Sequence, residues 1–393
     1  WFRYREGFSG ELIKELIKDS GASKDEIIID PFSGSGTTPV VAVLEGYNGF
    51  GMDVNPLSTY IANVKMQKYT EFELQSCMTI INAIPENSEA DTNKYADISK
   101  YFELENFETL CILKKFIDKI DNKNVKSIYL TAFLCIVESC SNRRRDGNGL
   151  KTVKTKITDV RSNFVVKLTE IVNDLKTTLH SFQSVGTCIT GSATNLFEVY
   201  NKYNESKKLK AGAIIFSPPY PNSFDYFESY KLELVFGDFA ENIKGIKNFR
   251  QQAVRSFIGG RIQPESEKYI NYIAEEIEKA IPIKEAETGK KDARTRKVPN
   301  MIKGYFSDMQ EIIKQCGLCL EKGKKIYIVV DQSAYVGVIV PTDLLLAYLS
   351  EQEGFEVASI IECRKCRTSA QQLSRYPYLK NVLRESIVEL VKK

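Results

Sequence analysis

The feature that most constrains this chain is a glycine-containing turn, Asp30-Pro-Phe-Ser-Gly-Ser-Gly-Thr-Thr38, which lies between two apolar segments. Residues 26–30, before the turn, are apolar and β-branched, a pattern typical of a short strand that is buried on both faces. Residues 40–44, after it, are apolar at helical spacing, and Thr37 and Thr38 are suited to cap a helix there. The sequence therefore predicts a strand, a glycine turn and a helix in succession.

Such a turn is typical of a cofactor site. Gly34 and Gly36 lack the side chains that would keep a ligand away from the backbone, and the start of a helix presents unpaired N–H groups. A phosphate-cradling loop requires Gly-Lys-Ser/Thr, whereas Gly36 is followed by Thr37. A dinucleotide fingerprint favours a third small residue where this chain has Pro39, which weighs against a nicotinamide or flavin. The third ligand class that uses such turns is S-adenosylmethionine, and the nicotinamide and flavin interpretation stays open beside it.

A second predicted strand, residues 49–52, ends in Asp53, which lies seventeen positions after Gly36. An acidic residue at the end of the second strand can accept hydrogen bonds from both ribose hydroxyls of a nucleoside. Asn55 follows at the start of the next helix, where it can also serve as a cap. The strand, the turn, the helix and the carboxylate together predict a nucleoside pocket.

Three segments together resemble the amino-methylating DNA methyltransferases: the glycine turn, Gly51-Met-Asp-Val-Asn-Pro56, and Ser217-Pro-Pro-Tyr220. The resemblance covers most of the chain outside a central insertion. It implies an α/β, Rossmann-like class I methyltransferase fold, with a mostly parallel seven-stranded sheet and helices on both faces. It also implies S-adenosyl-L-methionine as cofactor and double-stranded DNA as substrate. The cofactor-binding residues that it implies are Phe8, Ser9, Asp30, Phe32, Gly34, Gly36, Thr37, Thr38, Asp53, Asn55 and Ser192.

Some of these assignments have alternatives. In the family, the segment that corresponds to Phe8 and Ser9 closes over the methionine end of the cofactor, but an aromatic clamp that packs on the sheet explains these residues equally well. Ser192 follows the third predicted strand, residues 184–190, at a position that lies near the adenine in the family and often carries an acidic or polar residue. The contact in this chain would therefore come from a hydroxyl.

The third motif supplies a chemical reason for the resemblance. Residues 212–216 predict a fourth strand, and ligands of open α/β sheets bind at the carboxyl ends of the strands. An exocyclic amino group is a poor nucleophile because its lone pair is delocalised into the ring. Acceptors that take hydrogen bonds from its two protons favour a pyramidal nitrogen with an available lone pair. Pro218 and Pro219 have no N–H, so the turn offers the Pro218 carbonyl beside the Ser217 hydroxyl, while Tyr220 can stack on the base. We expect these four residues to be catalytic.

The amino group of a base in duplex DNA is paired, so the nucleotide must be flipped into the site. Phe224, Asp225 and Tyr226 follow the motif and are the expected walls of the base pocket. Methyl transfer is then a direct displacement that depends on positioning and aligned acceptors. Methylation of a ring carbon would need a cysteine nucleophile, and residues 213–230 contain none.

We expect three regions: residues 1–69 with the cofactor loop, a helical insertion at 70–183 as a possible DNA-recognition region, and residues 184–393 with the catalytic turn. The insertion contains Arg143, Arg144 and Arg145 on a glycine-punctuated loop. These arginines either contact DNA phosphates or a guanine edge, or form a solvated surface. A second basic segment, near residues 284–303, has few apolar residues and predicts a mobile loop.

Composition adds several limits. The chain has 54 Lys and Arg against 51 Asp and Glu, a net charge of +3. Because this net charge is small, any basic surface must be confined to a local region. We expect a cytoplasmic protein without membrane association, because no apolar run approaches the ~20 residues of a transmembrane helix and the start lacks a signal-peptide pattern. Two Cys-x-x-Cys pairs, Cys316/Cys319 and Cys363/Cys366, fall in a helical pattern and at the end of a strand, and we expect no metal site.

The sequence favours an enzyme of a restriction-modification or related defence system, with a cognate restriction endonuclease as a possible partner. Its predicted product is N4-methylcytosine, because the Ser217 hydroxyl can donate to cytosine N3 as well as accept, and because Ser at this position resembles the cytosine-N4 enzymes. N6-methyladenine remains an alternative, since adenine N1 is also an acceptor. Two further interpretations stay open, an RNA amino methyltransferase and a non-catalytic nucleic-acid-binding module.

Overall fold

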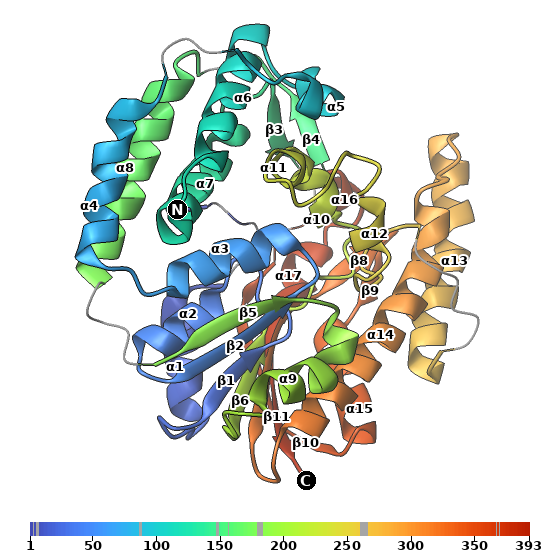
Figure 1. Ribbon diagram of the computed structural model, residues 1–393. Coiled ribbons are helices and arrows are strands. Elements are labelled where there is room, and N and C mark those ends of the chain that lie inside the picture. The colour runs from blue at the N-terminus through green and yellow to red at the C-terminus, as the bar shows by residue number, and fades with distance from the viewer. Residues whose placement is uncertain are drawn as a thin grey trace. The chain divides into compact units, whose positions relative to one another are not determined.

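The computed structural model describes residues 1–2, 4, 8–85, 89–146, 149–155, 157–178, 184–259, 266–366, 368 and 370–393 (Figure 1). Seven strands form one sheet in the order β10-β11-β7-β6-β1-β2-β5. They are β1 (Ile27–Asp30), β2 (Asn48–Asp53), β5 (Gly186–Thr190), β6 (Ala211–Phe216), β7 (Lys325–Asp331), β10 (Phe355–Lys365) and β11 (Arg384–Lys392). The pairs β1–β6, β6–β7 and β2–β5 are parallel, whereas β11 is antiparallel to both β7 and β10. The expected α/β fold with a mostly parallel seven-stranded sheet is thus confirmed.

The chain forms two compact units. Unit 1 comprises Trp1–Gly7, Ser33–Thr190 and Tyr226–Gln251, and unit 2 comprises Phe8–Phe32, Gly191–Asp225 and Gln252–Lys393. The glycine turn from Ser33 onwards and Asp53 therefore belong to unit 1, whereas the Ser217–Tyr220 turn belongs to unit 2.

Unit 1 combines two strands of the sheet with a helical cluster. In this cluster α4 and α8 lie side by side and both pack against α7 (Figure 1), where the buried rings of Tyr129 and Phe164 are 5.7 Å apart. The helices are α2 (Thr37–Leu44), α3 (Pro56–Met66), α4 (Glu71–Ile80), α5 (Ala96–Ser99), α6 (Leu104–Asp118), α7 (Lys123–Val137), α8 (Val160–Thr178), α10 (Tyr226–Ser229), α11 (Lys231–Phe236) and α12 (Lys247–Arg250). The described part of residues 70–183 is largely helical, but it also contains a hairpin of β3 (Arg143–Asp146) and β4 (Gly149–Thr152).

Unit 2 contains the other five strands of the sheet and the hairpin of β8 (Ser333–Tyr335) and β9 (Val338–Val340). Its helices are α1 (Gly10–Asp19), α9 (Leu196–Asn204), α13 (Lys268–Thr288), α14 (Val298–Cys319), α15 (Thr342–Gln352), α16 (Ala370–Arg375) and α17 (Leu379–Val382). Every residue of β1 and β6 is buried, as are the five central residues of β7. This explains why the strands are continuous apolar runs in the sequence rather than alternating ones.

The structure corrects two local expectations. The N-cap of α2 is Gly36, which makes no side-chain capping bond, so Thr37 and Thr38 lie within the helix. The basic segment at 284–303 is mostly helical rather than a loop: α13 extends to Thr288 and α14 begins at Val298. Ion pairs between Lys284 and Asp292 and between Arg296 and Glu285 stabilise the short connection. A composition-based prediction of a loop does not account for such pairs.

Among the described residues, no helix is long and apolar enough to cross a lipid bilayer. The two Cys-x-x-Cys pairs lie where the sequence indicates. Cys316 and Cys319 are on α14, and Cys363 is on β10, three residues before Cys366. Burial raises the pKa of the Cys319 thiol to about 12, so this side chain is a poor thiolate ligand.

Candidate active site

The glycine turn of unit 1 adopts a conformation that glycine permits. Gly34 has φ 49° and Gly36 has φ 90°. A Cβ atom at Gly36 would lie 2.6 Å from the Cβ of Ala62 on α3, and one at Gly34 would lie 3.0 Å from Cε1 of Tyr4. The glycine at 36 thus allows α3 to pack closely against the turn, a role that the sequence alone does not indicate.

Asp53 connects the end of β2 to this turn. One carboxylate oxygen, Oδ2, accepts a hydrogen bond from the Gly34 N–H at 2.9 Å, and Oδ1 accepts one from the Asn55 N–H at 2.8 Å. Burial raises the pKa of Asp53 to about 6, and the two N–H donors partly oppose this shift. Asn55 in turn caps α3, because its side chain accepts from the Leu57 N–H at 3.1 Å. The structure therefore brings Gly34, Asp53 and Asn55 together, as the sequence predicts.

These residues fit a nucleoside. Each Asp53 oxygen has accepted one backbone N–H and retains a further lone pair for a ribose hydroxyl. The Ser33 Oγ is buried and has no hydrogen-bond partner within the described residues, so a polar group is available at the turn. Lys65 on α3 donates to the Ser35 carbonyl at 2.8 Å and fixes the other side of the turn. Burial lowers the pKa of this lysine to about 8.

An aromatic stack lies beside Gly34, and its first member, Tyr4, is not indicated by any sequence motif. The Tyr4 ring is parallel to the Tyr230 ring at a centroid distance of 4.9 Å, and it also stacks with Tyr226 at 6.1 Å. Burial, together with the charge of Asp53, raises the pKa of the Tyr4 hydroxyl well above its ordinary value. Tyr226, expected in the wall of a base pocket, is thus part of a stack that reaches the glycine turn in unit 1.

The three arginines of the insertion lie on β3 rather than on a loop. Arg145 is only 7% exposed and forms ion pairs with Glu138 and with Glu233, which is 1% exposed. Its Nε donates to the Ser229 carbonyl at 3.1 Å, and its guanidinium lies 4.3 Å from the centre of the Tyr230 ring. Arg145 therefore points into unit 1, and the expectation that it grips DNA phosphate does not fit its burial.

The other two arginines are also engaged within unit 1. Arg144 donates to the backbone carbonyls of Glu138 at 2.7 Å and Ser139 at 3.1 Å. Arg143 lies over the Tyr101 ring, with 5.0 Å between its Cζ and the ring centre. Both side chains are half-buried. A run of charges in the sequence is here mainly a set of internal contacts.

In unit 2, the Ser217–Tyr220 turn begins immediately after β6, as the sequence predicts. The hydroxyls of Ser217 and Tyr220 are hydrogen-bonded at 3.0 Å. Ser217 and Pro219 are half-buried, whereas Pro218 and Tyr220 are buried. The motif thus forms a closed turn at the carboxyl edge of the sheet, where the two prolines limit backbone motion.

The residues after the motif are held by side chains that sequence reasoning missed. Tyr335 donates its hydroxyl proton to the Pro221 carbonyl at 2.7 Å. Ser223 has φ 64°, a conformation rare for a residue with a side chain, and its N–H donates to the Ser256 carbonyl at 3.0 Å. Phe224 is buried and Asp225 is half-buried in the same segment. The backbone that follows Tyr220 is therefore fixed rather than loose.

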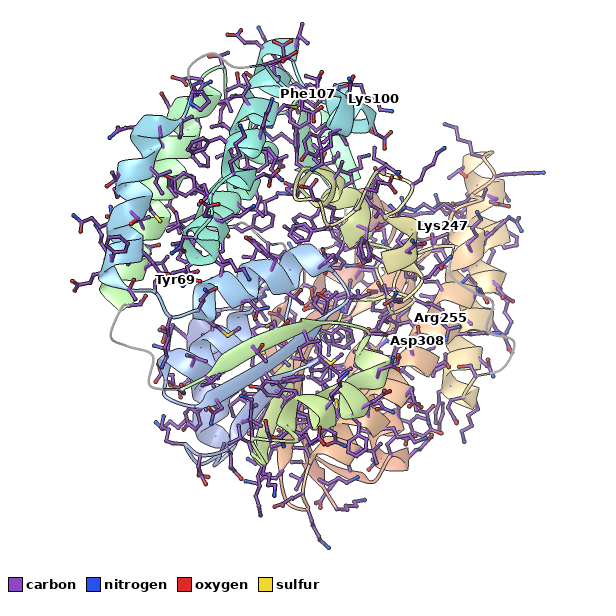
Figure 2. The ribbon with its side chains drawn as sticks, in the orientation of Figure 1. Tyr69, Lys100, Phe107, Lys247, Arg255 and Asp308 are labelled. Atoms are coloured by element: carbon purple, nitrogen blue, oxygen red, sulfur yellow. The ribbon has the colours of Figure 1, made fainter. Side chains whose placement is uncertain are left out.

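A second anchor acts through the segment that contains Ser256. Arg255, beside it, donates from Nε and from a terminal nitrogen to the carboxylate of Asp308 on α14, at 2.9 and 2.6 Å (Figure 2). Such a two-point contact fixes both the position and the orientation of the arginine. It links α14 to the backbone that bonds Ser223.

A polar cavity of ≈ 170 Å³ lies next to Tyr220 at the carboxyl end of β7. It is lined by Tyr220, Asn222, Asp331, Gln332, Ser333, Ala334, Tyr335, Cys366, Thr368, Gln372 and Leu383. Most of these residues carry hydrogen-bonding groups, which suits a polar planar ligand. The sequence gives the position of Tyr220, but the residues from β7 and from 366–383 are brought there only by the fold.

Of the remaining predicted cofactor residues, Thr37 and Thr38 lie in α2 of unit 1, and the others lie in unit 2. Asp30 accepts a hydrogen bond from the Phe32 N–H at 2.8 Å, and the Phe32 ring packs on Phe216 at the end of β6. Ser9 is the N-cap of α1 and accepts from the Leu12 N–H, while Phe8 is half-buried beside it. Ser192 donates to the Gln252 carbonyl at 2.9 Å. Its hydroxyl already has a protein partner, so its expected contact with adenine stays a prediction.

Known proteins resemble this chain in sequence. Residues 3–64 match a family model described as DNA methylase, of the N6 and N4 methyltransferases. The Type II methyltransferase M.AvaI of Nostoc sp. is 26% identical over 388 residues, which cover 92% of this chain and 80% of the relative. M.BsoBI of Geobacillus stearothermophilus, also a Type II methyltransferase, is 27% identical over 444 residues, with 98% and 84% covered. This chain is similar in sequence to DNA amino methyltransferases.

The matched segment of this chain contains the glycine turn, Asp53 and Asn55, whereas the Ser217–Tyr220 turn lies outside it. A further match is much shorter. The Type II methyltransferase M.MjaII of Methanocaldococcus jannaschii is 42% identical over 66 residues, which cover 17% of this chain and 12% of the relative. The matches to M.AvaI and M.BsoBI extend over most of this chain.

Proposed function

We propose that this protein transfers a methyl group from S-adenosyl-L-methionine to the exocyclic amino group of a base in double-stranded DNA, and that the base is cytosine, methylated at N4. The main support is the Ser217-Pro218-Pro219-Tyr220 turn at the end of β6, beside a polar cavity. The relatives are Type II methyltransferases, which makes a restriction-modification system and a cognate endonuclease part of the proposal.

Each unit has its own part in this proposal. In unit 1, Asp53 accepts from the ribose hydroxyls, Gly34 and Gly36 leave the backbone accessible, and Asn55 fixes the start of α3. When bound, the cofactor supplies an electrophilic methyl group on its sulfonium. In unit 2, the Pro218 carbonyl and the Ser217 hydroxyl accept hydrogen bonds from the two amino protons, and Tyr220 stacks on the flipped base. The proposed recognition of DNA sequence falls to the insertion at 70–183.

N4-methylcytosine is expected as the product of the purified enzyme with plasmid DNA and S-adenosylmethionine. The reason is that the Ser217 hydroxyl both accepts an amino proton and donates to cytosine N3, which an ionised carboxylate would not do. Mass spectrometry of the digested nucleosides identifies the product directly. N6-methyladenine without N4-methylcytosine would assign the enzyme to adenine instead, and methylation of RNA but not of DNA would favour the RNA alternative.

Replacing Asp53 by asparagine is expected to weaken S-adenosylmethionine binding by roughly 1.5–3 kcal/mol, the value of a hydrogen bond to a charged group. The carboxylate now accepts hydrogen bonds from the backbone N–H groups of Gly34 and Asn55. In the asparagine variant an NH₂ group replaces one of the two oxygens and faces one of these N–H donors. In the wild type, affinity is expected to decrease as the pH falls through about 6, because protonation of Asp53 removes an acceptor. The variant is expected to lack this pH dependence. Calorimetric titration at several pH values measures both effects.

The matched control for this experiment is Asp146→Asn. Asp146 is also in unit 1, but its carboxylate is 64% exposed, and its ion-pair partner within the described residues is Lys151 at 3.6 Å. Its replacement should leave cofactor affinity and the pH profile unchanged. If a folded Asp53→Asn protein binds the cofactor as the wild type does, Asp53 is not the ribose acceptor.

A further inference from the structure

The connection between α13 and α14 is a compact basic turn, which we define as residues 289–297. Gly289 ends α13 with φ 64°, and the 3₁₀ turn η4 (Thr295–Lys297) leads into α14. Asp292 organises the turn: it pairs with Lys284 and its Oδ1 accepts from the Thr295 N–H at 2.9 Å. η4 contacts both helices. The turn therefore has a defined structure within unit 2.

Charge is concentrated at this turn. Residues 284–297 contain six Lys or Arg and three Asp or Glu, so this short segment has the same net charge of +3 as the whole chain. All three acids have cationic partners: Glu285 with Arg296, Asp292 with Lys284, and Glu287 with Arg375. The exposed cations that have no ion pair within the described residues are Lys290, Lys291, Arg294 and Lys297. The ion pairs thus neutralise the three acidic side chains, and the four exposed cations form a cationic surface.

This surface lies near the cavity beside Tyr220. The ion pair between Glu287 and Arg375 joins the end of α13 to α16, and Gln372 of the same helix lines the cavity. Tyr335 also lines the cavity and donates to the carbonyl of Pro221, the residue after the catalytic motif. Burial raises the pKa of the Tyr335 hydroxyl to about 12, and its hydrogen bond with Ser223 and the positive charge of Arg294 oppose that shift. All of these residues belong to unit 2, and Arg294 is exposed to solvent.

We propose that the basic turn binds the DNA backbone and that Arg294 contacts a phosphate next to the nucleotide whose base enters the cavity. This inference rests on the proposed function, because it needs a flipped base beside Tyr220. Phosphate contacts fix the register of a protein on its duplex, and the planar guanidinium of arginine suits a two-point contact with phosphate. A base held in the cavity has its own phosphates just outside, on the side where the Glu287–Arg375 ion pair ties the basic turn to the helix that supplies Gln372 to the cavity.

The structure favours this turn over the arginines of β3 as a backbone contact. Arg145 is enclosed by two carboxylates, and Arg144 donates to several backbone carbonyls. Releasing them to bind phosphate would leave buried groups without partners. By contrast, Lys290, Lys291, Arg294 and Lys297 of the basic turn can bind phosphate without breaking any ion pair among the described residues.

The test compares two triple variants of the full chain. Lys290→Gln, Lys291→Gln and Arg294→Gln together remove three charges from the basic turn. The control combines Lys202→Gln, Lys208→Gln and Lys322→Gln, three exposed lysines of unit 2. Lys202 and Lys208 precede β6 and so lie toward the edge of the sheet opposite Ser217, and Lys322 follows the far end of α14, about 30 Å from the turn at 1.5 Å per residue. Both variants carry the same change of charge.

DNA affinity is measured against salt concentration for several duplex sequences. The turn variant should bind all duplexes more weakly, and its log-affinity versus log-salt slope should fall by about one unit for each phosphate that the turn no longer binds. The Michaelis constant for DNA should rise more than kcat falls, with cofactor affinity and melting temperature unchanged. An unchanged slope, or an equal change in the control, overturns the proposal. A wild-type protein that leaves DNA unmethylated overturns the proposed function and this inference together. If the wild type methylates DNA, the proposed function stands, and the comparison of the two triple variants then tests this inference alone.

Discussion

Replacing Arg145 by alanine is expected to lower the free energy of unfolding by about 3–5 kcal/mol, the cost of removing one partner from a buried ion pair. The substitution would leave the Glu233 carboxylate, which is 1% exposed, without its cation. Burial already raises the pKa of Glu233, and the positive charge of Arg145 now opposes that shift. The variant would also have no guanidinium against the Tyr230 ring. Denaturant unfolding followed by circular dichroism measures the change.

The pH dependence of the same variant has a definite sign. Without Arg145, the pKa of Glu233 in the folded state rises further above its value in the unfolded chain. The folded state then binds a proton more readily, so the variant should recover stability as the pH is lowered toward the range where Glu233 is protonated. Removing the acid as well, in Arg145→Met with Glu233→Leu, should restore much of the lost stability, because apolar residues can replace a buried pair.

Arg143→Ala is the matched control from the same strand. Arg143 is half-buried and lies over Tyr101, a cation–π contact worth about 0.5–1 kcal/mol. Its replacement should therefore destabilise unit 1 only slightly. If Arg145→Ala instead unfolds like Arg143→Ala but binds DNA poorly, then Arg145 is a DNA contact and its burial here does not describe the working enzyme.

Local signals in the sequence were sufficient for the framework of the fold. The apolar runs at β1, β6 and β7 are buried on both faces, so they indicate strands without knowledge of their neighbours. The position of Asp53 follows from the end of β2, and its hydrogen-bond donors are Gly34, 19 residues before it, and Asn55, two residues after it. Predictions of this kind succeed because the deciding interactions lie within one unit of strand, turn, helix and next strand.

Contacts between distant segments account for what the sequence missed. Gly36 is required by Ala62 of α3 as well as by its own φ of 90°. The sequence alone predicts that Arg145 is an exposed charge. In the fold, Glu233, which is 88 residues away in the chain, pairs with it. The basic segment near 290 looks like a loop because its stabilising ion pairs are not visible in composition. In each case the residue type alone predicts an exposed or flexible position. The fold brings a distant residue into contact with it, and that contact gives it a different role.

Ser217→Ala is expected to lower kcat by about 10²-fold, within the range for the loss of one positioned proton acceptor or transition-state hydrogen bond. In the proposed mechanism the Ser217 hydroxyl accepts one proton of the amino group, while the Pro218 carbonyl accepts the other. The alanine variant keeps the two prolines and the aromatic ring, so DNA and cofactor should bind with little change. A single-turnover assay with labelled S-adenosylmethionine separates the methyl-transfer step from binding.

Tyr220→Phe decides whether that loss is chemical or structural. The hydroxyls of Ser217 and Tyr220 are hydrogen-bonded to each other at 3.0 Å, so either substitution breaks the same bond within the turn. Phenylalanine keeps the ring that stacks on the base and leaves the Ser217 hydroxyl available to the amino group. We therefore expect Tyr220→Phe to retain most of the wild-type rate while Ser217→Ala does not. Equal losses in the two variants would mean that the hydroxyl pair only shapes the turn, and the Pro218 carbonyl would then be the one acceptor that the motif supplies.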